Sequence, residues 1–242
     1  MWDSDEENSI PHFMVVPLHA EEDWLPMLNG LSPFDPGDAP VLFLSPHPDD
    51  ESLAAGGLLA AQRARGKRVT LVAVTDGENA YADNAGLGHL RTREQTLAAA
   101  RLGIANENIL RLHMVDSGLN SELNALIERL LPHVSATTHI VAPWPHDFHP
   151  DHEACGRAAL ELARRTGARL TFYFFWTWHR GAPSLMKDFQ LKSFALSPAQ
   201  QKSKARAIAF HASQLQHKSG DPILHEIHLW PARLAFEVYL PA

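Results

Sequence analysis

The chain of 242 residues has a single cysteine, Cys155, no long apolar run and no excess of basic side chains. One cysteine excludes an intrachain disulfide and a cysteine-rich zinc site, and it fits a reducing compartment. The formal net charge of -7 argues against a surface for nucleic acid or for anionic membranes. No apolar run reaches the roughly 18 residues needed to span a bilayer. We therefore expect a cytoplasmic protein without a membrane span and without a nucleic-acid partner.

The N-terminus also lacks the features of a secretory signal peptide. Its first ten residues, MWDSDEENSI, are acidic where such a signal has basic residues followed by an apolar segment. Up to residue 39 the chain mixes acids, prolines and short apolar clusters, so residues 1–39 are interpreted as an extension packed on the main domain. Residues 40–242 are expected to form that single domain, because 45% hydrophobic residues can fill a sizeable core.

From residue 40 onward, apolar runs typical of buried strands alternate with segments that have the composition of helices. The expected strands are 41–44, 68–75, 108–113, 138–143 and 169–176. The expected helices are 51–66, 91–103, 120–131, 150–167 and 197–213. This alternation predicts βαβ units and an α/β, Rossmann-like three-layer domain with a mostly parallel sheet. Ligands of such sheets bind beyond the carboxyl ends of the strands.

Two polar clusters follow such strand ends. The chain has 15 histidines, an unusually large number, and some of them lie in these clusters. The side chains of the metal-ligand type in these clusters include His47, Asp49, Asp50, His149 and His152. Catalytic zinc sites use three nitrogen or oxygen ligands and keep a fourth position for water. The set of His47, Asp50 and His152 would meet this requirement. Asp49 and His149 would then be free to handle protons.

Each cluster also has an ordinary interpretation when it is taken alone. Three adjacent acids, residues 49–51, most often form a solvated first turn that the helix dipole favours. Two histidines three residues apart on a helix are more often surface or capping residues than ligands. Both interpretations weaken because the clusters fall at equivalent ends of one parallel sheet. Gly56 and Gly57, which are unfavourable inside a helix, are expected to let that helix pack closely on the sheet.

The two clusters together resemble a known family. PHPDDE (46–51) followed by HPDH (149–152) is similar to the motifs of the PIG-L/LmbE zinc-dependent N-acetyl-sugar deacetylases. TDGE (75–78), RTRE (91–94) and FHASQ (210–214) also look like elements of that family. The resemblance covers most of the chain and implies an LmbE-like fold. It further implies a hydrolase that removes the acetyl group of a small N-acetylated amino-sugar (GlcNAc-type) conjugate by metal-activated water.

Carried over position by position, the resemblance implies three ligands for Zn²⁺, with Fe²⁺ as the alternative ion: His47, Asp50 and His152. Asp49 would be the general base that deprotonates the bound water. His149, as a cation, would stabilise the oxyanion or protonate the leaving amine. Asp151 would orient or tune His149.

Further side chains are placed where they could overhang the strand ends and contact substrate hydroxyls or phosphates: Glu78, Arg91, Arg93 and His211. Exposed charge is the default interpretation of the first three, and Arg93 could equally pair with Glu94. His211 could instead cap its helix. His146 and Asp147 precede the second motif and are candidates to hold a ligand from behind. Trp176 and Trp178 could line a sugar-binding wall, although a place in the core is the simpler expectation.

Three other functions are compatible with these residues. One is hydrolysis of another amide, such as a thiol-conjugate amide. A second is a non-haem Fe(II) oxidoreductase, because two histidines and one carboxylate also form the facial triad of such enzymes, although usually on an all-β scaffold. The third is a non-catalytic sugar-binding domain, which would bind without turnover and would need no general base. The sequence leaves the aglycone, the oligomeric state and the role of residues 1–39 open.

Overall fold

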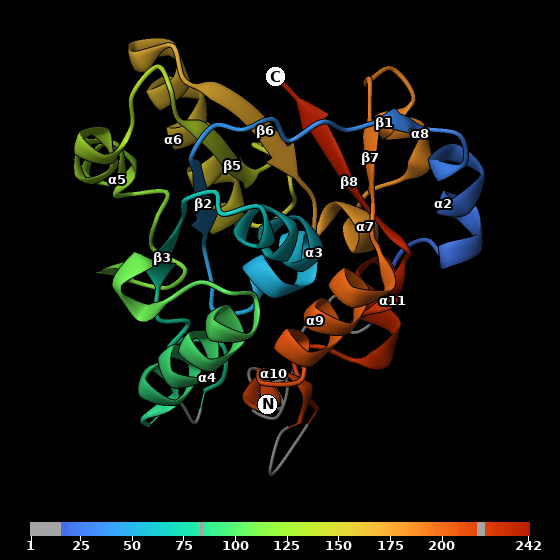
Figure 1. Cartoon of the computed structure of the whole chain (residues 1–242). Coiled ribbons are helices and arrows are strands. Elements are labelled where there is room, and N and C mark those ends of the chain that lie inside the picture. The colour runs from blue at the N-terminus through green and yellow to red at the C-terminus, as the bar shows by residue number, and fades with distance from the viewer. Residues whose placement is uncertain (1–15, 83–84, 217–220) are drawn as a thin grey trace.

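An eight-stranded sheet lies at the centre of the computed structural model, which describes residues 16–82, 85–216 and 221–242 (Figure 1). The strands are β1 (Ser32–Pro33), β2 (Val41–Ser45), β3 (Val69–Thr75), β4 (Ile109–Met114), β5 (His139–Pro143), β6 (Arg169–Tyr173), β7 (Lys192–Ala195) and β8 (Phe236–Pro241). Their order across the sheet is β1-β7-β8-β6-β5-β2-β3-β4. The five strands from β6 to β4 are parallel, whereas β8 is antiparallel to both β6 and β7.

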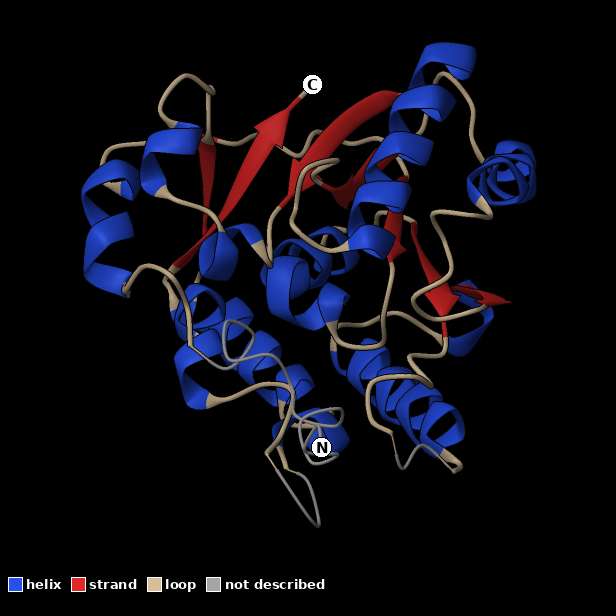
Figure 2. Ribbon diagram, turned by 180° about the vertical axis from the view of Figure 1, so that it is seen from behind, coloured by secondary structure: helices blue, strands red, loops and turns tan. Residues whose placement is uncertain are grey.

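Helices cover both faces of this sheet, as Figures 1 and 2 show from opposite sides. The α-helices are α2 (Glu21–Leu28), α3 (Asp50–Ala64), α4 (Leu87–Arg101), α5 (Leu123–Leu130), α6 (Pro150–Thr166), α7 (Thr177–Arg180), α8 (Pro183–Met186), α9 (Pro198–Ile208), α10 (Ala212–Leu215) and α11 (Trp230–Arg233). Three 3₁₀ turns, η1 (Asn106–Asn108), η2 (Leu131–His133) and η3 (Glu226–His228), join them in the described chain.

The two faces have separate hydrophobic cores because successive side chains of a strand point to opposite sides. In β2, Leu42 and Leu44 belong to the core under α5 and α6, while Val41 and Phe43 belong to the core under α3 and α4. All four are at most 2% exposed, which is why the run reads as continuously apolar. The predicted α/β domain with a mostly parallel sheet and helices on both faces is confirmed.

The chain order of the parallel strands defines where a ligand can enter. From β2 the chain proceeds outward through β3 to β4, and then returns to β5 and β6 on the other side of β2. The connections therefore diverge between the carboxyl ends of β2 and β5. Such a switch point leaves a crevice in open parallel sheets. The segments after these two strands carry the two polar clusters.

Several boundaries differ from the expected ones. Helix α4 begins at Leu87, before the expected residue 91, and the helix expected over 197–213 is divided into α9 and α10. Strand β6 ends at Tyr173 instead of residue 176, because the carboxylate of Asp147 accepts the backbone N–H groups of residues 175–177. A backbone that donates to this carboxylate cannot also extend the ladder.

The glycine pair of α3 allows close packing, but its partner is not the sheet. A Cβ atom on Gly57 would overlap the side chain of Leu196, and one on Gly56 would lie 3.0 Å from Cγ of Lys204 on α9. The expected packing on the sheet is therefore wrong: the glycines admit α9 and the strand end before it, because those elements cross directly over α3.

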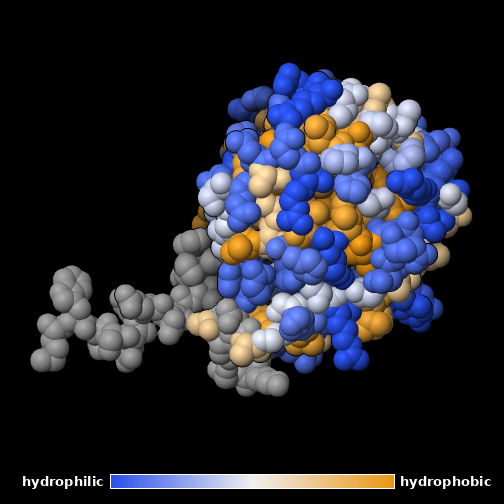
Figure 3. Space-filling model, turned by 90° about the vertical axis from the view of Figure 1, so that its left-hand side faces the viewer, coloured by the Kyte–Doolittle hydropathy of each residue, from blue (hydrophilic) through white to orange (hydrophobic). Residues whose placement is uncertain are grey.

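The part of the N-terminal segment that the structure describes contributes to the core. Trp24 is fully buried, and its ring packs edge-on against Trp178 with centroids 5.0 Å apart. Strand β1 adds to the sheet beside β7. Residues 1–15 of the expected extension lie outside the described residues. Among the described helices, none has the length and apolar character to cross a membrane, and Figure 3 shows one face on which polar and apolar side chains are interspersed.

Candidate metal centre and active site

The two polar clusters meet at the switch point, and Asp50 lies between their histidines. Its Oδ1 is 3.4 Å from Nε2 of His152, and its Oδ2 is 3.6 Å from Nδ1 of His47. Ligand atoms around a tetrahedral zinc ion, with bonds of about 2.0–2.1 Å, are separated by about 3.3 Å. The structure thus brings the three expected ligands together, with one histidine at each oxygen of Asp50.

The ring of His152 is oriented for metal binding. Its Nδ1 is 2.8 Å from Oδ2 of Asp147, so the carboxylate holds the proton on that nitrogen. Its Nε2 is buried and has no hydrogen-bond partner in the described chain. Burial opposes protonation of the ring, but Asp50 and Asp147 raise the pKa of His152 to about 9. The two nearby carboxylates and the Nε2 atom without a hydrogen-bond partner are compatible with a bound cation.

His47 has the same arrangement with the roles of its nitrogens exchanged. Its Nε2 lies 3.2 Å from Oδ2 of Asp151 and 3.3 Å from Oδ1 of Asp116. Burial opposes protonation here too, yet these carboxylates raise the pKa of His47 well above its ordinary value. Asp151 itself is held by the backbone N–H of Ser117 at 2.7 Å. With Nε2 turned to the carboxylates, Nδ1 is the nitrogen left for a metal.

Two other triples of ligand-type side chains have atoms within 4.8 Å of one another in the described chain: His47, His149 and His152, and His47, Asp116 and Asp151. The carboxylates of the second triple already accept backbone N–H groups, since Asn79 donates to Asp116 at 3.0 Å. In the first triple, Nδ1 of His149 accepts the N–H of Asp151 at 3.2 Å. Asp50 likewise accepts the backbone N–H of His47 at 2.9 Å, so all of these side chains are held around one site.

Asp49 is buried next to the ligands and has a strained backbone. It precedes α3 with a φ angle of 147°, a region that side chains other than glycine rarely adopt and that often marks functional sites. Burial raises the pKa of Asp49 to about 6, against the opposing charge of Arg91. Nη2 of Arg91 is 3.4 Å from Oδ2 of Asp49. A carboxylate with a pKa near neutrality can accept and return a proton at neutral pH.

His149 is neutral in this environment. Burial, followed by the positive charges of His47, His152 and Arg180, lowers the pKa of His149 to about 2. Because Nδ1 accepts the N–H of Asp151, the proton of the neutral ring resides on Nε2. The lowered pKa favours the neutral ring, and the expected cationic form of His149 stays a prediction. A neutral ring can still donate a hydrogen bond from Nε2.

Asp151 contacts a different histidine from the one expected. Its carboxylate lies against Nε2 of His47, and only its backbone N–H reaches the ring of His149. The residue orients His149 through the main chain and His47 through the side chain. The reason is the first turn of α6, where His149 is the N-cap and its ring accepts a helix N–H.

The four residues that were expected to contact the substrate lie in different surroundings. Arg91 lines a pocket together with His47, Asp49 and His152, but it is 3% exposed and donates to the carbonyl oxygens of Gly77 and Pro48. Glu78 accepts the backbone N–H of Asp116 at 2.9 Å, and Arg93 is exposed on α4.

His211, the fourth of them, is buried and is not among the residues that line the pocket. Its Nε2 lies 3.0 Å from the hydroxyl of Ser52 and 3.4 Å from Oε1 of Glu51. It supports the start of α3. The alternative pair of Arg93 with Glu94 is not formed either, because Glu94 accepts both the backbone N–H and the hydroxyl of Ser213.

This pocket has a volume of about 150 Å³ and includes side chains that the sequence reasoning did not single out: Asn79, Asp116, Ser117, Ile223 and Leu224. Gln214, from the FHASQ stretch, also lines it. Asp116 follows β4, so its position at a third strand end of the same sheet was a usable signal. Trp176 forms a wall, with its ring stacked at 6.0 Å on that of His149 and under the guanidinium of Arg180. Trp178 lies in the core, as expected.

Fold and site define an α/β protein with a possible His/Asp metal-binding group at the switch point of its sheet. The profile of the PIG-L family, described as GlcNAc-PI de-N-acetylase, matches residues 42–163, a stretch that contains both motifs. The chain belongs to this family. The resemblance inferred from PHPDDE and HPDH is thereby confirmed.

Two relatives of this chain are described as deacetylases. A probable N-acetyl-alpha-D-glucosaminyl L-malate deacetylase 2 of Bacillus cereus is 32% identical over 141 residues, which are 52% of this chain and 61% of that protein. Diacetylchitobiose deacetylase of Thermococcus kodakarensis is 27% identical over 52% of this chain and 50% of its own length. The chain thus spans between half and about three fifths of the length of these relatives.

A solved structure supports the fold. The zinc inhibited form of teicoplanin deacetylase Orf2 superposes with a TM-score of 0.64 at 19% identity, over 83% of this chain and 97% of that one. At this identity the likeness concerns the arrangement of helices and strands. Its coverage is larger than the stretch of residues 42–163 that the family profile matches.

Proposed function

We propose that the protein is a metal-dependent N-deacetylase that hydrolyses the acetamide of a small N-acetylated amino-sugar conjugate. The observation that carries this proposal is the buried Nε2 of His152, which lacks a hydrogen-bond partner in the described chain and faces Asp50 beside the buried carboxylate of Asp49. Family membership and the printed names of the relatives, which are deacetylases of N-acetylglucosaminyl malate and of diacetylchitobiose, support the same reaction class.

The metal ligands in this proposal are His47, Asp50 and His152. Two imidazoles and one carboxylate suit Zn²⁺, and Fe²⁺ is the alternative ion. When bound, such an ion polarises an acyl carbonyl and lowers the pKa of a water molecule. The carboxylates of Asp147 and Asp151 hold the two imidazoles so that one nitrogen of each remains available.

The other residues of the pocket would handle protons and charge. Asp49 accepts a proton from the attacking water, and Arg91 keeps its carboxylate in place. His149 donates a hydrogen bond from Nε2 to the acetamide oxygen as negative charge develops there. The protonated Asp49 then returns its proton to the departing amine nitrogen, which requires a pKa near neutrality. The products are acetate and a free amino sugar.

Recognition of the sugar is assigned to further polar side chains that line the same pocket. Asn79, Arg91 and Asp116 line the pocket together and offer donors and acceptors for hydroxyl groups. The indole of Trp176 provides an apolar face on the other side of His149. A pocket with an apolar wall and a few convergent polar groups is typical of small-molecule sites.

The proposal is tested by acetate release from a panel of N-acetylglucosaminides. The protein is stripped of metal, reloaded with Zn²⁺ or Fe²⁺, and assayed alongside the stripped form. We expect turnover only after reloading. Turnover of a thiol-conjugate amide but not of any N-acetylglucosaminide would instead assign the protein to that other amide class. Oxygen consumption without acetate release would indicate the oxidoreductase.

A further inference from the structure

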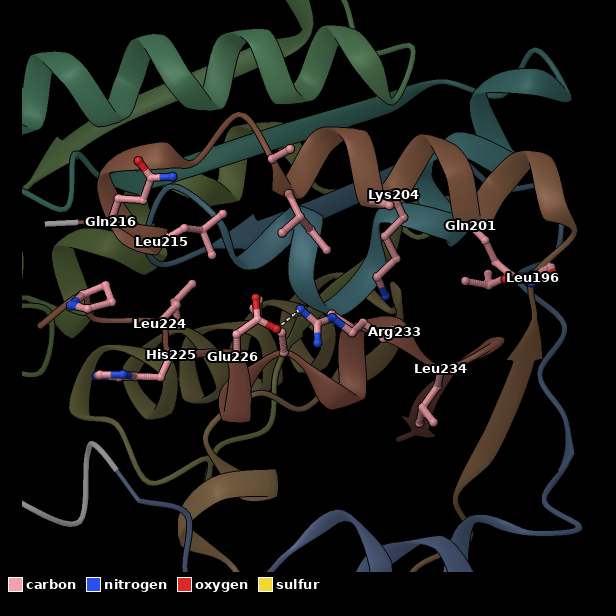
Figure 4. A pocket seen from close by; sticks show the side chains of 16 residues that line it. Leu196, Gln201, Lys204, Leu215, Gln216, Leu224, His225, Glu226, Arg233 and Leu234 are labelled. Carbon is pink, nitrogen blue, oxygen red and sulfur yellow. Dashed lines mark hydrogen bonds and ion pairs between the residues drawn. The ribbon is translucent and has the colours of Figure 1, made fainter.

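A cavity of about 700 Å³ lies between α9 and the segment 222–234, whose side chains approach each other across it in Figure 4. The backbone N–H of Leu224 donates to the carbonyl oxygen of Gln214 at 2.9 Å, and this bridge lies between the cavity and the pocket at the proposed metal site. Lys204 and Arg233, which line the cavity, are paired with carboxylates of the protein. The cavity is therefore walled off from the proposed reaction, and the contacts of His149 bear on that reaction more directly.

Arg180, at the end of α7, contacts the indole that stacks on His149. Its Cζ lies 4.1 Å from the centroid of the Trp176 ring, a distance typical of a cation–π contact. The Trp176 ring is in turn nearly parallel to that of His149, with 19° between the planes and 6.0 Å between the centroids. The imidazole that is proposed to donate to the acetamide oxygen is thus connected to Arg180 through one indole.

Arg180 also contacts the main chain directly before His149. Its Nη1 donates to the carbonyl oxygen of Phe148 at 2.6 Å, a short charge-assisted hydrogen bond. This carbonyl belongs to the peptide group that joins Phe148 to His149. Because that group is planar, a donor that fixes its oxygen also fixes the direction in which the backbone of His149 begins.

Phe148 needs such a partner because its backbone is strained. Its φ is 59°, in the left-handed region that bulky side chains rarely adopt. Residues of this kind persist where the surrounding structure holds them. The ring of Phe148 also packs against the turn after Arg180, since a Cβ atom on Gly181 would lie 3.2 Å from Cε2 of Phe148. Residues 180 and 181 therefore hold Phe148 at both its carbonyl group and its ring.

The ring of His149 depends on these contacts for its direction. Its Nδ1 accepts the backbone N–H of Asp151 at 3.2 Å, which fixes one ring atom. The terminal torsion of such a ring has no sharply preferred value, so one hydrogen bond leaves the ring able to tilt. The proposed ligands His47 and His152 border the ring on the metal side. Trp176 restrains it from a separate segment of the chain, through a stacked contact.

We propose that Arg180 is a positioning residue of the deacetylation, which holds Phe148 and Trp176 so that Nε2 of His149 points to the acetamide oxygen. This inference rests on the proposed function. Arg180 is not among the residues that line the pocket, so its contribution is made through His149. Because misplacing a group of the active site by 1 Å can cost about 10²-fold in rate, the restraint of this ring affects turnover.

Arg180→Met and Arg180→Lys test the proposal on the Zn²⁺-loaded protein, with an N-acetylglucosaminide that the wild type turns over. Arg180→Met keeps an apolar stem but loses the charge and the hydrogen bond to Phe148, and it should lower kcat about 10- to 100-fold. The affinity for Zn²⁺, measured with a chelating dye, should be unchanged. Arg180→Lys retains a donor but not the planar guanidinium, so it should recover part of the loss and guards against a variant that folds poorly.

Arg164→Met is the matched control, because Arg164 is exposed near the end of α6, where it pairs with Glu161. It should retain the kcat of the wild type.

The decisive comparison repeats Arg180→Met in the His149→Gln background. If Arg180 acts through His149, the double variant should have the same kcat as His149→Gln alone, since the group that Arg180 positions is already absent. A general structural defect would instead lower kcat by the same factor in both backgrounds. Unchanged kcat in Arg180→Met, an effect confined to KM, or equal losses in both backgrounds would overturn the inference and leave the deacetylase proposal standing.

A measurement independent of turnover separates the two proposals. The ring signals of His149 in proton–nitrogen correlation NMR spectra are assigned by their loss in His149→Gln. Arg180→Met should shift these signals, whereas Arg164→Met should not. Absence of acetate release by the wild type would refute the deacetylase. The shift of the His149 signals would then still support the restraint by Arg180, and unchanged signals would refute it as well.

Discussion

Asp147 and His152 form a fully buried hydrogen bond of 2.8 Å between Oδ2 and Nδ1. The same carboxylate accepts three backbone N–H groups at the end of β6, from Phe175, Trp176 and Thr177. The carboxylate of Asp147 thus orients the proposed metal ligand His152 and also ends strand β6. The proposed metal site is in this way built into the sheet and does not depend on a surface loop.

Asp147→Asn should weaken metal binding by about 10- to 100-fold, because an amide cannot hold the Nδ1 proton as a carboxylate does. Competition with a chelating dye measures the affinity for Zn²⁺ directly. Asp188→Asn, at an exposed position, is the matched control. Circular dichroism confirms that the variants are folded. Equal zinc affinity in the two variants would refute the supporting role of Asp147.

The variants Asp49→Asn and Asp50→Asn should have different effects, because Asp49 is the proposed general base and the adjacent Asp50 is a proposed metal ligand. Asp49→Asn should retain the metal and lose about 10²- to 10⁴-fold in kcat, the range ascribed to general base catalysis. Asp50→Asn should lose the metal. Metal content by atomic emission, together with acetate release, distinguishes the two. The assignment is reversed if Asp49→Asn is the variant that loses the metal.

Gly77→Ala should destabilise the protein and reduce its activity. Gly77 has a φ of 66°, and a Cβ atom there would overlap the guanidinium of Arg91, which holds Asp49. We expect a loss of about 1–2 kcal/mol from backbone strain and about 1–3 kcal/mol more from overpacking.

Gly66→Ala is the control for this substitution, because its φ of 72° imposes the same strain while nothing lies within 4 Å of the added atom. Urea unfolding of both variants measures the difference. Similar free energies of unfolding in the two would show that the contact with Arg91 is unimportant.

Stability should fall with decreasing pH because of His139, which lies at the end of β5 remote from the proposed metal site. Burial, with the charge of Arg169, lowers the pKa of His139 to about 4. The unfolded chain takes up a proton near pH 6.5, so the contribution to stability is complete above that pH and is lost toward pH 4. The loss amounts to about 3 kcal/mol at most.

His139→Gln preserves a side chain able to hydrogen-bond Thr171, which His139 contacts through Nε2 at 2.9 Å. It should flatten the dependence of the free energy of unfolding on pH between 6.5 and 4. His133→Gln, exposed in η2, is the control. The same slope in wild type and His139→Gln would contradict the assignment.

The proposed ligands were accessible from sequence because their chemistry is local. His47, Asp49 and Asp50 follow an apolar strand, and His149 and His152 open a helix, so the pattern of a parallel α/β domain places both groups at strand ends. The contacts of Asp151 and the protonation of His149 were not accessible. Both depend on the direction of side chains across the crevice and on which charges surround a buried ring.

The amino-acid sequence by itself determined the α/β class, the helices that cover the sheet and the identity of the proposed ligands, since periodicity and spacing are properties of neighbouring residues. Only the tertiary structure decided that Asp116 lies against His47, that Arg91 is buried beneath Asp49, and that Leu224 separates two cavities. These relationships join residues 42 to 69 positions apart, or segments that meet only when α9 packs on α3. Such contacts follow from the packing of complete elements, which no local pattern specifies.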